Sequence, residues 1–153
     1  MFKRAWFVNV TDPEPDGAVY QYWDTAHGKF NPRRKGDRSV CTTWRREKNR
    51  YRLIGLYVGR PSYPELKKKA IELRERHKAR ALIIEDHSSG QSLIQDLRNS
   101  TRIPVLPWKT GSESKESRAD AVTDEWESGV AVISLPEHLA QMVIQEHLQF
   151  PNG

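Results

Sequence analysis

The alternation of apolar and polar positions predicts a run of strands followed by alternating helices and strands. Three stretches with strand-like patterning come first, at residues 17–24, 38–46 and 50–59. Their connections are short, so an antiparallel meander is the simplest arrangement. The later elements are predicted helices at 63–78, 87–99 and 136–150, and predicted strands at 81–85, 103–108 and 129–135. This order predicts an α/β fold, in which a mixed sheet of five to six strands carries helices on both faces.

The same patterning assigns particular side chains to faces of the strands. Val40, Thr42 and Trp44 fall on one face of the second strand. Cys41 is the single cysteine, so it can form neither an internal disulfide nor a cysteine-based zinc cluster, and we interpret it as a small apolar residue. The apolar run at 103–108 is interpreted as a short buried strand.

Length and composition indicate one domain of ordinary size. The chain has 153 residues, of which 37% are hydrophobic. Residues 1–16 mix aromatic residues with Pro, Asp and Glu and are predicted to be a linker or N-terminal arm, with the domain proper at 17–153. No stretch approaches the roughly 20 apolar residues of a membrane span, and the N-terminus lacks the apolar core of a signal peptide. We therefore expect an intracellular protein with no membrane partner.

Positive charge is concentrated in the first half of the chain. The net charge is +5, but residues 1–80 hold 20 of the 25 Lys and Arg and 9 of the 20 Asp and Glu. The basic residues occur in clusters: Lys29, Arg33, Arg34 and Lys35 in one loop, then Arg45, Arg46, Lys48, Arg50 and Arg52, and then Lys67, Lys68 and Lys69. Any one cluster could be a solvated surface, whereas the summed excess favours a polyanionic partner such as nucleic acid.

Two predicted strands end in carboxylates. The first ends at Asp24, and the strand at 81–85 ends at Glu85, with Asp86 next to it and then His87. Ligand sites gather at the carboxyl ends of strands in open α/β sheets, and carboxylates suit hard cations such as magnesium. A pair of such ions about 4 Å apart can promote phosphodiester cleavage. A purely structural alternative stays open, in which Asp24 forms a turn and Asp86 caps a helix.

Other common chemistries find little support. Phe30 follows the Gly-Lys pair where a nucleotide-binding loop needs Ser or Thr, and the five histidines lack zinc-ligand spacing. Ser88, Ser89 and Gly90 lack the glycine pattern of a nucleophile elbow. We expect that triplet to turn the chain into the following helix.

Six stretches, taken in order, resemble a known family. They are "YWDTAHGK", "DRSVCTTW", "YRLIGLYVGRPSYPELKKKAI", "ALIIEDHSSGQSLIQDLR", "SKESRADAV" and "FPNG". Together they are similar to the C-terminal nuclease domain of phage terminase large subunits, over nearly the whole chain. The resemblance implies a ribonuclease H-like fold and a metal-dependent endonuclease that cuts concatemeric viral DNA during packaging, from a phage or prophage.

The resemblance also implies site residues and partners. The two catalytic acids of the family fall on Asp24 and Glu85, which would hold Mg²⁺ or Mn²⁺, two ions in a complete domain, with Asp86 as a neighbouring candidate ligand. Lys115 and Arg118 match basic positions of the family's loop and are candidate DNA contacts. The implied partners are double-stranded DNA, the terminase ATPase domain, the small terminase subunit and the portal, in the cytoplasm of a bacterial host cell.

The sequence departs from the family pattern at its C-terminal end. The family continues past "FPNG" into an Asp-rich motif that supplies a third metal ligand, and this chain ends at Gly153. We therefore expect a truncated domain with weak metal binding and little or no cleavage. A catalytically incomplete module that holds DNA or packaging proteins is the alternative, and a transposase or resolvase is a third reading.

Overall fold

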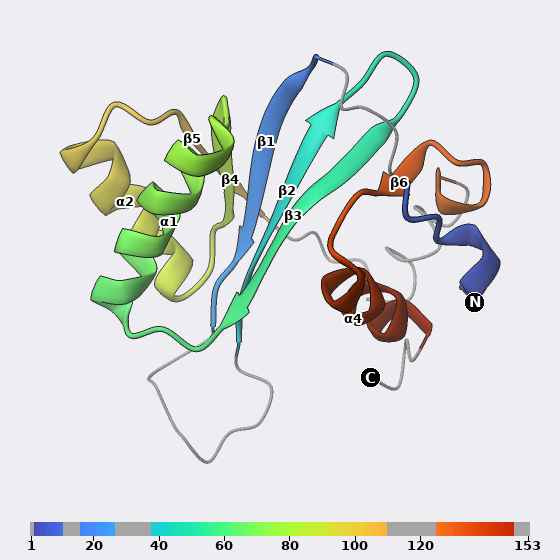
Figure 1. Ribbon diagram of the computed structural model, residues 1–153. Helices are drawn as coiled ribbons and strands as arrows, with labels where there is room; N and C mark the ends of the chain where they lie inside the picture. Colours follow the sequence, from blue (N-terminus) through green and yellow to red (C-terminus); the bar gives the residue numbers. More distant parts are fainter. Residues whose placement is uncertain (1, 11–15, 27–37, 110–124, 149–153) are drawn as a thin grey trace. The chain divides into compact units, whose positions relative to one another are not determined.

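The computed structural model describes residues 2–10, 16–26, 38–109 and 125–148 (Figure 1). The chain forms two compact units. The first comprises Met1–Gly17, Trp44–Gly55 and Gly111–Gly153, and the second comprises Ala18–Thr43 and Leu56–Thr110.

A mixed six-stranded sheet has the strand order β5-β4-β1-β2-β3-β6. Its strands are β1 (Ala18–Asp24), β2 (Ser39–Arg46), β3 (Tyr51–Gly59), β4 (Ala81–Glu85), β5 (Val105–Trp108) and β6 (Ala131–Ile133). Strands β1, β2 and β3 alternate in direction (Figure 1), whereas the pairs β1/β4, β4/β5 and β3/β6 are parallel. The predicted mixed sheet with an N-terminal antiparallel meander is therefore confirmed.

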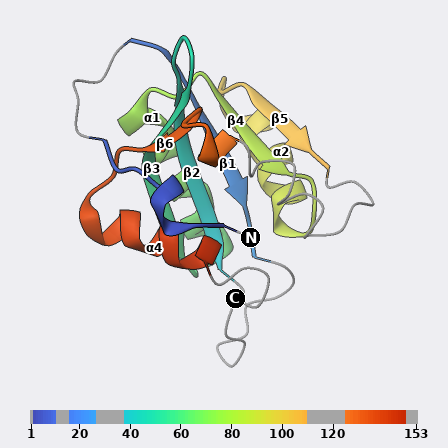
Figure 2. The same cartoon turned by 90° about the vertical axis from the view of Figure 1, so that its right-hand side faces the viewer.

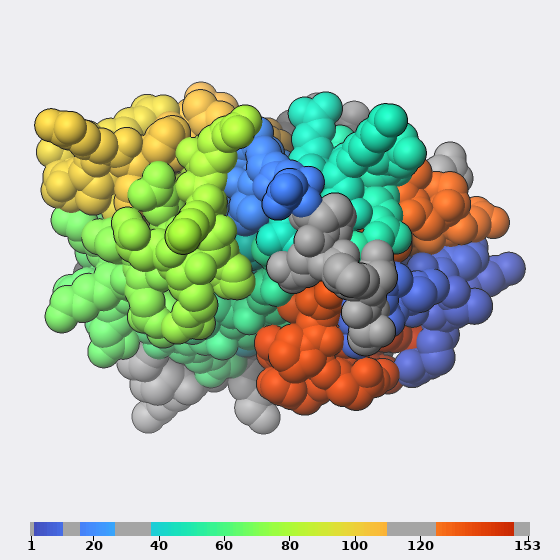
Figure 3. Space-filling view, turned by 45° about the horizontal axis from the view of Figure 1, so that its top comes forward, coloured from blue at the N-terminus to red at the C-terminus, as the bar shows by residue number. Residues whose placement is uncertain are grey.

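Two helices of the second unit pack side by side. Helix α1 (Tyr63–His77) buries Leu66, Ala70 and Leu73, which recur at helical spacing, and is followed in the chain by β4 and then α2 (Ser89–Ser100). The Tyr63 hydroxyl of α1 donates a hydrogen bond to Asp96 of α2. The outer surfaces of the two helices adjoin in the space-filling view (Figure 3, green and yellow).

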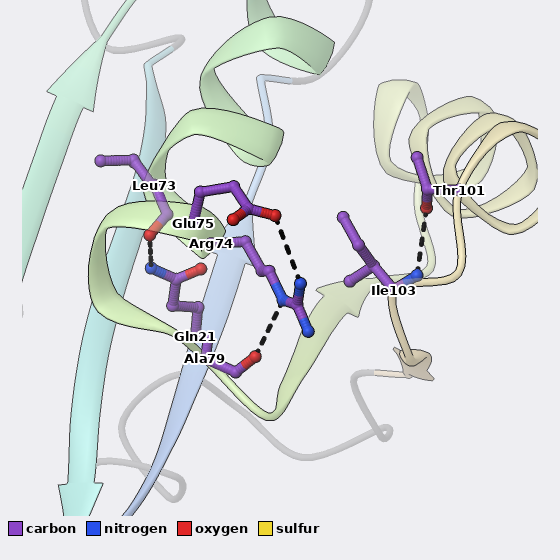
Figure 4. Close-up of polar contacts among 7 residues, drawn as sticks. All are labelled: Gln21, Leu73, Arg74, Glu75, Ala79, Thr101 and Ile103. Carbon is purple, nitrogen blue, oxygen red and sulfur yellow. Dashed lines mark hydrogen bonds and ion pairs between the residues drawn. The ribbon is translucent and has the colours of Figure 1, made fainter.

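A buried polar side chain ties α1 to the sheet. Gln21 of β1 is fully buried and donates from Nε2 to the carbonyl of Leu73 at 3.0 Å (Figure 4). The same Nε2 donates to Thr43 Oγ1 of β2 at 3.1 Å. Alternation along β1 places Trp23 on the same face as Gln21, so α1 covers the face of β1 that carries Trp23. The opposite face carries Asp24.

Strand β5 differs from its prediction as a buried strand. Only Val105 is buried, whereas Leu106 and Trp108 are 53% and 49% exposed. The reason is its place at the edge of the sheet, where it pairs with β4 alone (Figure 2). The apolar run shows strand propensity, but it does not show which strands will be covered.

In β2, the more deeply buried positions lie on the face opposite to Val40 and Thr42. Ser39, Cys41 and Thr43 are 1–2% exposed, whereas Val40 and Thr42 are only partly buried. Cys41, interpreted from the sequence as a small apolar residue, is buried in β2.

In the first unit, aromatic residues form the core beside helix α4 (Glu137–Leu148). Phe7 is buried and its ring centroid lies 4.9 Å from that of Trp126 and 5.2 Å from that of His147. Asn9 forms a parallel bridge with Ile133 of β6. The described part of the predicted N-terminal arm therefore packs within this unit, and a boundary at residue 16 stays a prediction. Across the described ranges, no helix is both long and apolar enough to cross a bilayer.

Candidate catalytic site

Two carboxylates meet at the carboxyl end of the sheet in the second unit. Strand β1 ends at Asp24 and β4 ends at Glu85, and their parallel pairing, with Trp23 opposite Ile84, brings the two ends together. A hydrogen bond joins the two carboxyl groups. The structure thus places side by side the two residues predicted to be catalytic, which are 61 positions apart in the chain.

The proximity of the two acids changes the charge on Asp24. Partial burial, the hydrogen bond with Glu85 and the negative charge of Glu85 raise the pKa of Asp24 from 3.8 to about 7, while His87 opposes the rise. The residue is exposed as a whole, but its carboxyl group is partly buried. At neutral pH the pair therefore retains a proton for much of the time, as crowded carboxylates do.

Replacing Asp24 with asparagine should remove a pH dependence of stability. The pKa of Asp24 is higher in the folded than in the unfolded protein, so the stability of the metal-free parent should fall as the pH rises from about 4 to about 7. Asparagine does not titrate, so Asp24→Asn should exceed the parent at about pH 8 by roughly 1 kcal/mol, reduced from the full shift because the residue is exposed. Thermal melts in EDTA at about pH 5 and about pH 8 measure this. If the stability difference between Asp24→Asn and the parent were the same at both pH values, the prediction would be wrong.

Asp86, the further candidate ligand, makes other contacts. Its backbone N–H donates to the carbonyl of Trp108 at 2.7 Å, and its carboxylate lies 3.9 Å from Lys109 Nζ. Within the described ranges, no three or more His, Cys, Asp or Glu residues are grouped so that they could hold a metal ion. The structure therefore brings together two of the three candidate ligands, and a ligand role for Asp86 stays a prediction.

The turn from β4 into α2 fixes the residues that follow Asp24. Ser89 donates to the carbonyl of Ala26 at 2.7 Å, and its Oγ lies 2.9 Å from Thr25 Oγ1. Ala26 in turn donates from its backbone N–H to Ser39 Oγ at 3.1 Å. The triplet beginning at Ser88 does turn the chain, as expected, and its second serine also links α2 to the end of β1.

Gly90 permits the close approach of α2 to β4. A Cβ atom at this position would lie 2.1 Å from the carbonyl oxygen of Glu85 and 3.3 Å from Thr25 Oγ1. Ser88, just before the helix, has φ 49°, a left-handed conformation that costs free energy in a non-glycine residue. The sequence predicted a turn at Ser88, Ser89 and Gly90, but it did not show that Ser89 contacts the residues after β1 or that Gly90 lies against the backbone of Glu85.

All six predicted DNA contacts lie outside the described residues. They are Lys29, Arg33, Arg34, Lys35, Lys115 and Arg118. Their role stays a prediction.

One of the predicted basic clusters is partly occupied by an ion-pair network. Arg52 is fully buried and pairs with Glu47, which also accepts a hydrogen bond from Arg50 at 2.7 Å. Burial raises the pKa of Glu47, but the two arginines outweigh this effect and hold the pKa below its usual range. Arg52 therefore serves the interior of the first unit and is not available to a phosphate.

A comparison with protein-family models finds a match over most of the chain. A family model described as "Terminase RNaseH-like domain" matches residues 21–141. No curated protein matches the sequence.

Three solved structures illustrate the shared fold. The large terminase of a thermophilic bacteriophage, in complex with ADP, is 17% identical, with a TM-score of 0.64, over 87% of this chain and 32% of that chain. A mutant nuclease domain of the large terminase subunit gp2 of bacterial virus Sf6, with manganese and beta-thujaplicinol, is 13% identical, with a TM-score of 0.67. The match covers 97% of this chain and 80% of that chain. The human cytomegalovirus terminase nuclease domain, soaked in Mn, is 13% identical, with a TM-score of 0.58. The match covers 97% of this chain and 86% of that chain.

The chain therefore spans about a third of the length of the thermophilic bacteriophage large terminase. The family model covers most of the chain, including both strand-end acids. The chain belongs to the terminase RNase H-like domain family, the nuclease domain of terminase large subunits.

Proposed function

We propose that this chain is the metal-dependent DNA endonuclease domain of a viral or prophage DNA-packaging terminase, and that it cuts concatemeric DNA. The observation that carries the proposal is the pairing of Asp24 and Glu85 at the ends of adjacent parallel strands. Membership of the terminase family supports it. So do the two nuclease-domain structures with manganese, because their fold is shared.

The donor set fits a hard divalent cation. Both carboxylates offer oxygen ligands, and their crowding keeps a proton on the pair up to about pH 7. A cation in place of that proton would relieve the repulsion between Asp24 and Glu85. These residues would hold Mg²⁺ or Mn²⁺, with Asp86 as a further candidate, and the ion supplies Lewis-acid stabilisation of charge on the phosphate.

The protein itself contributes rigidity and charge. Strands β1 and β4 fix the two carboxylates, and the contacts of Ser89 fix the chain that follows Asp24. In the proposed complex, Lys29, Arg33, Arg34, Lys35, Lys115 and Arg118 neutralise phosphates of double-stranded DNA. An ATPase domain, the small terminase subunit and the portal would be its partners in packaging.

A plasmid-nicking assay tests the proposal. We expect any nicking of supercoiled plasmid by this chain to be slow, to require Mn²⁺ and to disappear in Asp24→Ala, because that variant removes one carboxylate of the pair. Conversion to open circles is followed on agarose gels, with EDTA as the metal-free control. Robust nicking that survives Asp24→Ala would overturn the assignment.

A second function is favoured by one observation. Since no group of three potential ligands occurs in the part of the chain that the structure describes, the domain could bind DNA or packaging proteins without cutting. Salt-sensitive DNA binding with no Mn²⁺-dependent nicking would support this binding module over the nuclease.

A further inference from the structure

An open pocket lies between the end of β3 and the first turns of α1, in the second unit. Its cavity volume is about 460 Å³, and its lining includes Tyr57, Arg60, Lys68 and Lys69. Figure 1 shows β1 and β3 running in the same direction, so the carboxyl ends of the two strands lie on the same side of the sheet. The pocket, at the end of β3, is therefore at the same end of the strands as Asp24. None of these four residues belongs to the predicted catalytic pair.

The two acids that line the pocket are already engaged by neighbouring groups. Glu65 accepts a hydrogen bond from the backbone N–H of Ser62 as part of the capping box of α1. Glu72 pairs with Lys69 at 3.2 Å and with Arg76 at 2.6 Å. Glu72 is therefore paired with two cations of the helix, and Glu65 is held at the start of the helix by its hydrogen bond to Ser62.

Two cations in the pocket have no such partner. Arg60 and Lys68 are exposed, and their side chains form no hydrogen bond or ion pair with the part of the chain that the structure describes. A guanidinium and an ammonium group facing one open pocket form a favourable environment for an anion, and an arginine can bind phosphate through two parallel hydrogen bonds.

The aromatic wall of the pocket connects it to the strand that carries Asp24. Lys69 Nζ lies 5.5 Å from the ring centroid of Tyr57, and that ring lies 5.8 Å from the ring of Trp23, the residue before Asp24. Gly59 gives the Tyr57 side chain its space, since a Cβ there would lie 2.5 Å from the Tyr57 hydroxyl. Packing thus fixes the pocket against β1, on the face that carries Trp23 and close to the end of the strand where Asp24 stands on the opposite face.

We propose that this pocket binds a backbone phosphate of the DNA substrate at a distance from the hydrolysed bond. The inference rests on the proposed nuclease function, because the pocket lies at the same end of the strands as Asp24, and this position favours DNA over other polyanions. Arg60 and Lys68 supply the charge, and Tyr57 forms the wall that holds the pocket open. The site positions the duplex and takes no part in hydrolysis.

The test is DNA binding by the double variant Arg60→Gln/Lys68→Gln, measured as fluorescence anisotropy of a short labelled duplex without divalent metal over a series of KCl concentrations. We expect affinity to fall about tenfold and the slope of log affinity against log salt to decrease in magnitude by about one, because one phosphate contact is lost. The matched control is Arg80→Gln/Arg102→Gln, which removes the same amount of positive charge from exposed residues. These residues precede β4 and β5 and therefore lie at the opposite end of the strands from the pocket. Its affinity should stay within about twofold of the parent.

Equal losses in the two double variants would overturn the inference, since net charge alone would explain them. Unchanged DNA binding by Arg60→Gln/Lys68→Gln would overturn it too.

A nicking assay of Asp24→Asn separates failure of the phosphate site from failure of the proposed function. If the pocket variant loses binding while nicking does not depend on Asp24, the phosphate site stands and the nuclease assignment falls. If nicking depends on Asp24 while the pocket variant binds normally, only the phosphate site falls.

Discussion

Replacing Gly90 by alanine should destabilise the protein by about 2 kcal/mol, or roughly 4–8 °C in Tm for a chain of this size. A Gly to Ala change inside a helix usually stabilises a protein by up to about 1 kcal/mol. The destabilisation that we expect here is therefore opposite to the usual effect. The reason is steric: the new Cβ would lie 2.1 Å from the carbonyl oxygen of Glu85, which belongs to the backbone and cannot rotate away. Helix α2 would have to move away from the end of β4, and Glu85 would shift with it. Thermal melts and Mn²⁺ binding by the same variant measure both effects.

Gly129 provides a matched control. It has φ +80° and a Cβ there would meet nothing within 4 Å, so Gly129→Ala should cost only the backbone strain, about 1 kcal/mol. Its Mn²⁺ affinity should equal that of the parent. If Gly90→Ala were as stable as the parent or more so, the close approach of α2 to β4 would be wrong.

Most of the secondary structure could be predicted from periodicity, because each element carries its own pattern. Helix α1 shows this well, since Leu66, Ala70 and Leu73 recur at helical spacing and all three are buried. What periodicity could not give was the environment of each strand. Leu106 and Trp108 form an apolar run like that of a buried strand, yet β5 lies at the sheet edge, and strand order is a tertiary property.

The candidate site was predictable in part for the same reason. An acid at a strand end can be read from local sequence, and so Asp24 and Glu85 were both found. Their adjacency depends on the parallel pairing of β1 with β4, which no local pattern encodes and which the family resemblance implied. The burial of Arg52 against Glu47 was missed, because a count of charges does not distinguish a surface arginine from a buried one.

The central claim is that Asp24 and Glu85 together form a divalent-cation site, and Mn²⁺ binding tests it most directly. Free Mn²⁺ is quantified by electron paramagnetic resonance as protein is added at about pH 8, where the carboxyl pair has lost its proton. We expect weak binding by the parent chain that falls at least about tenfold in Asp24→Asn and in Glu85→Gln, because losing even an outer-shell partner commonly costs 10–100-fold. Glu75→Gln is the matched control, since Glu75 is 70% exposed near the C-terminal end of α1 and should bind Mn²⁺ as the parent does. Unchanged Mn²⁺ affinity in both Asp24→Asn and Glu85→Gln would contradict the account.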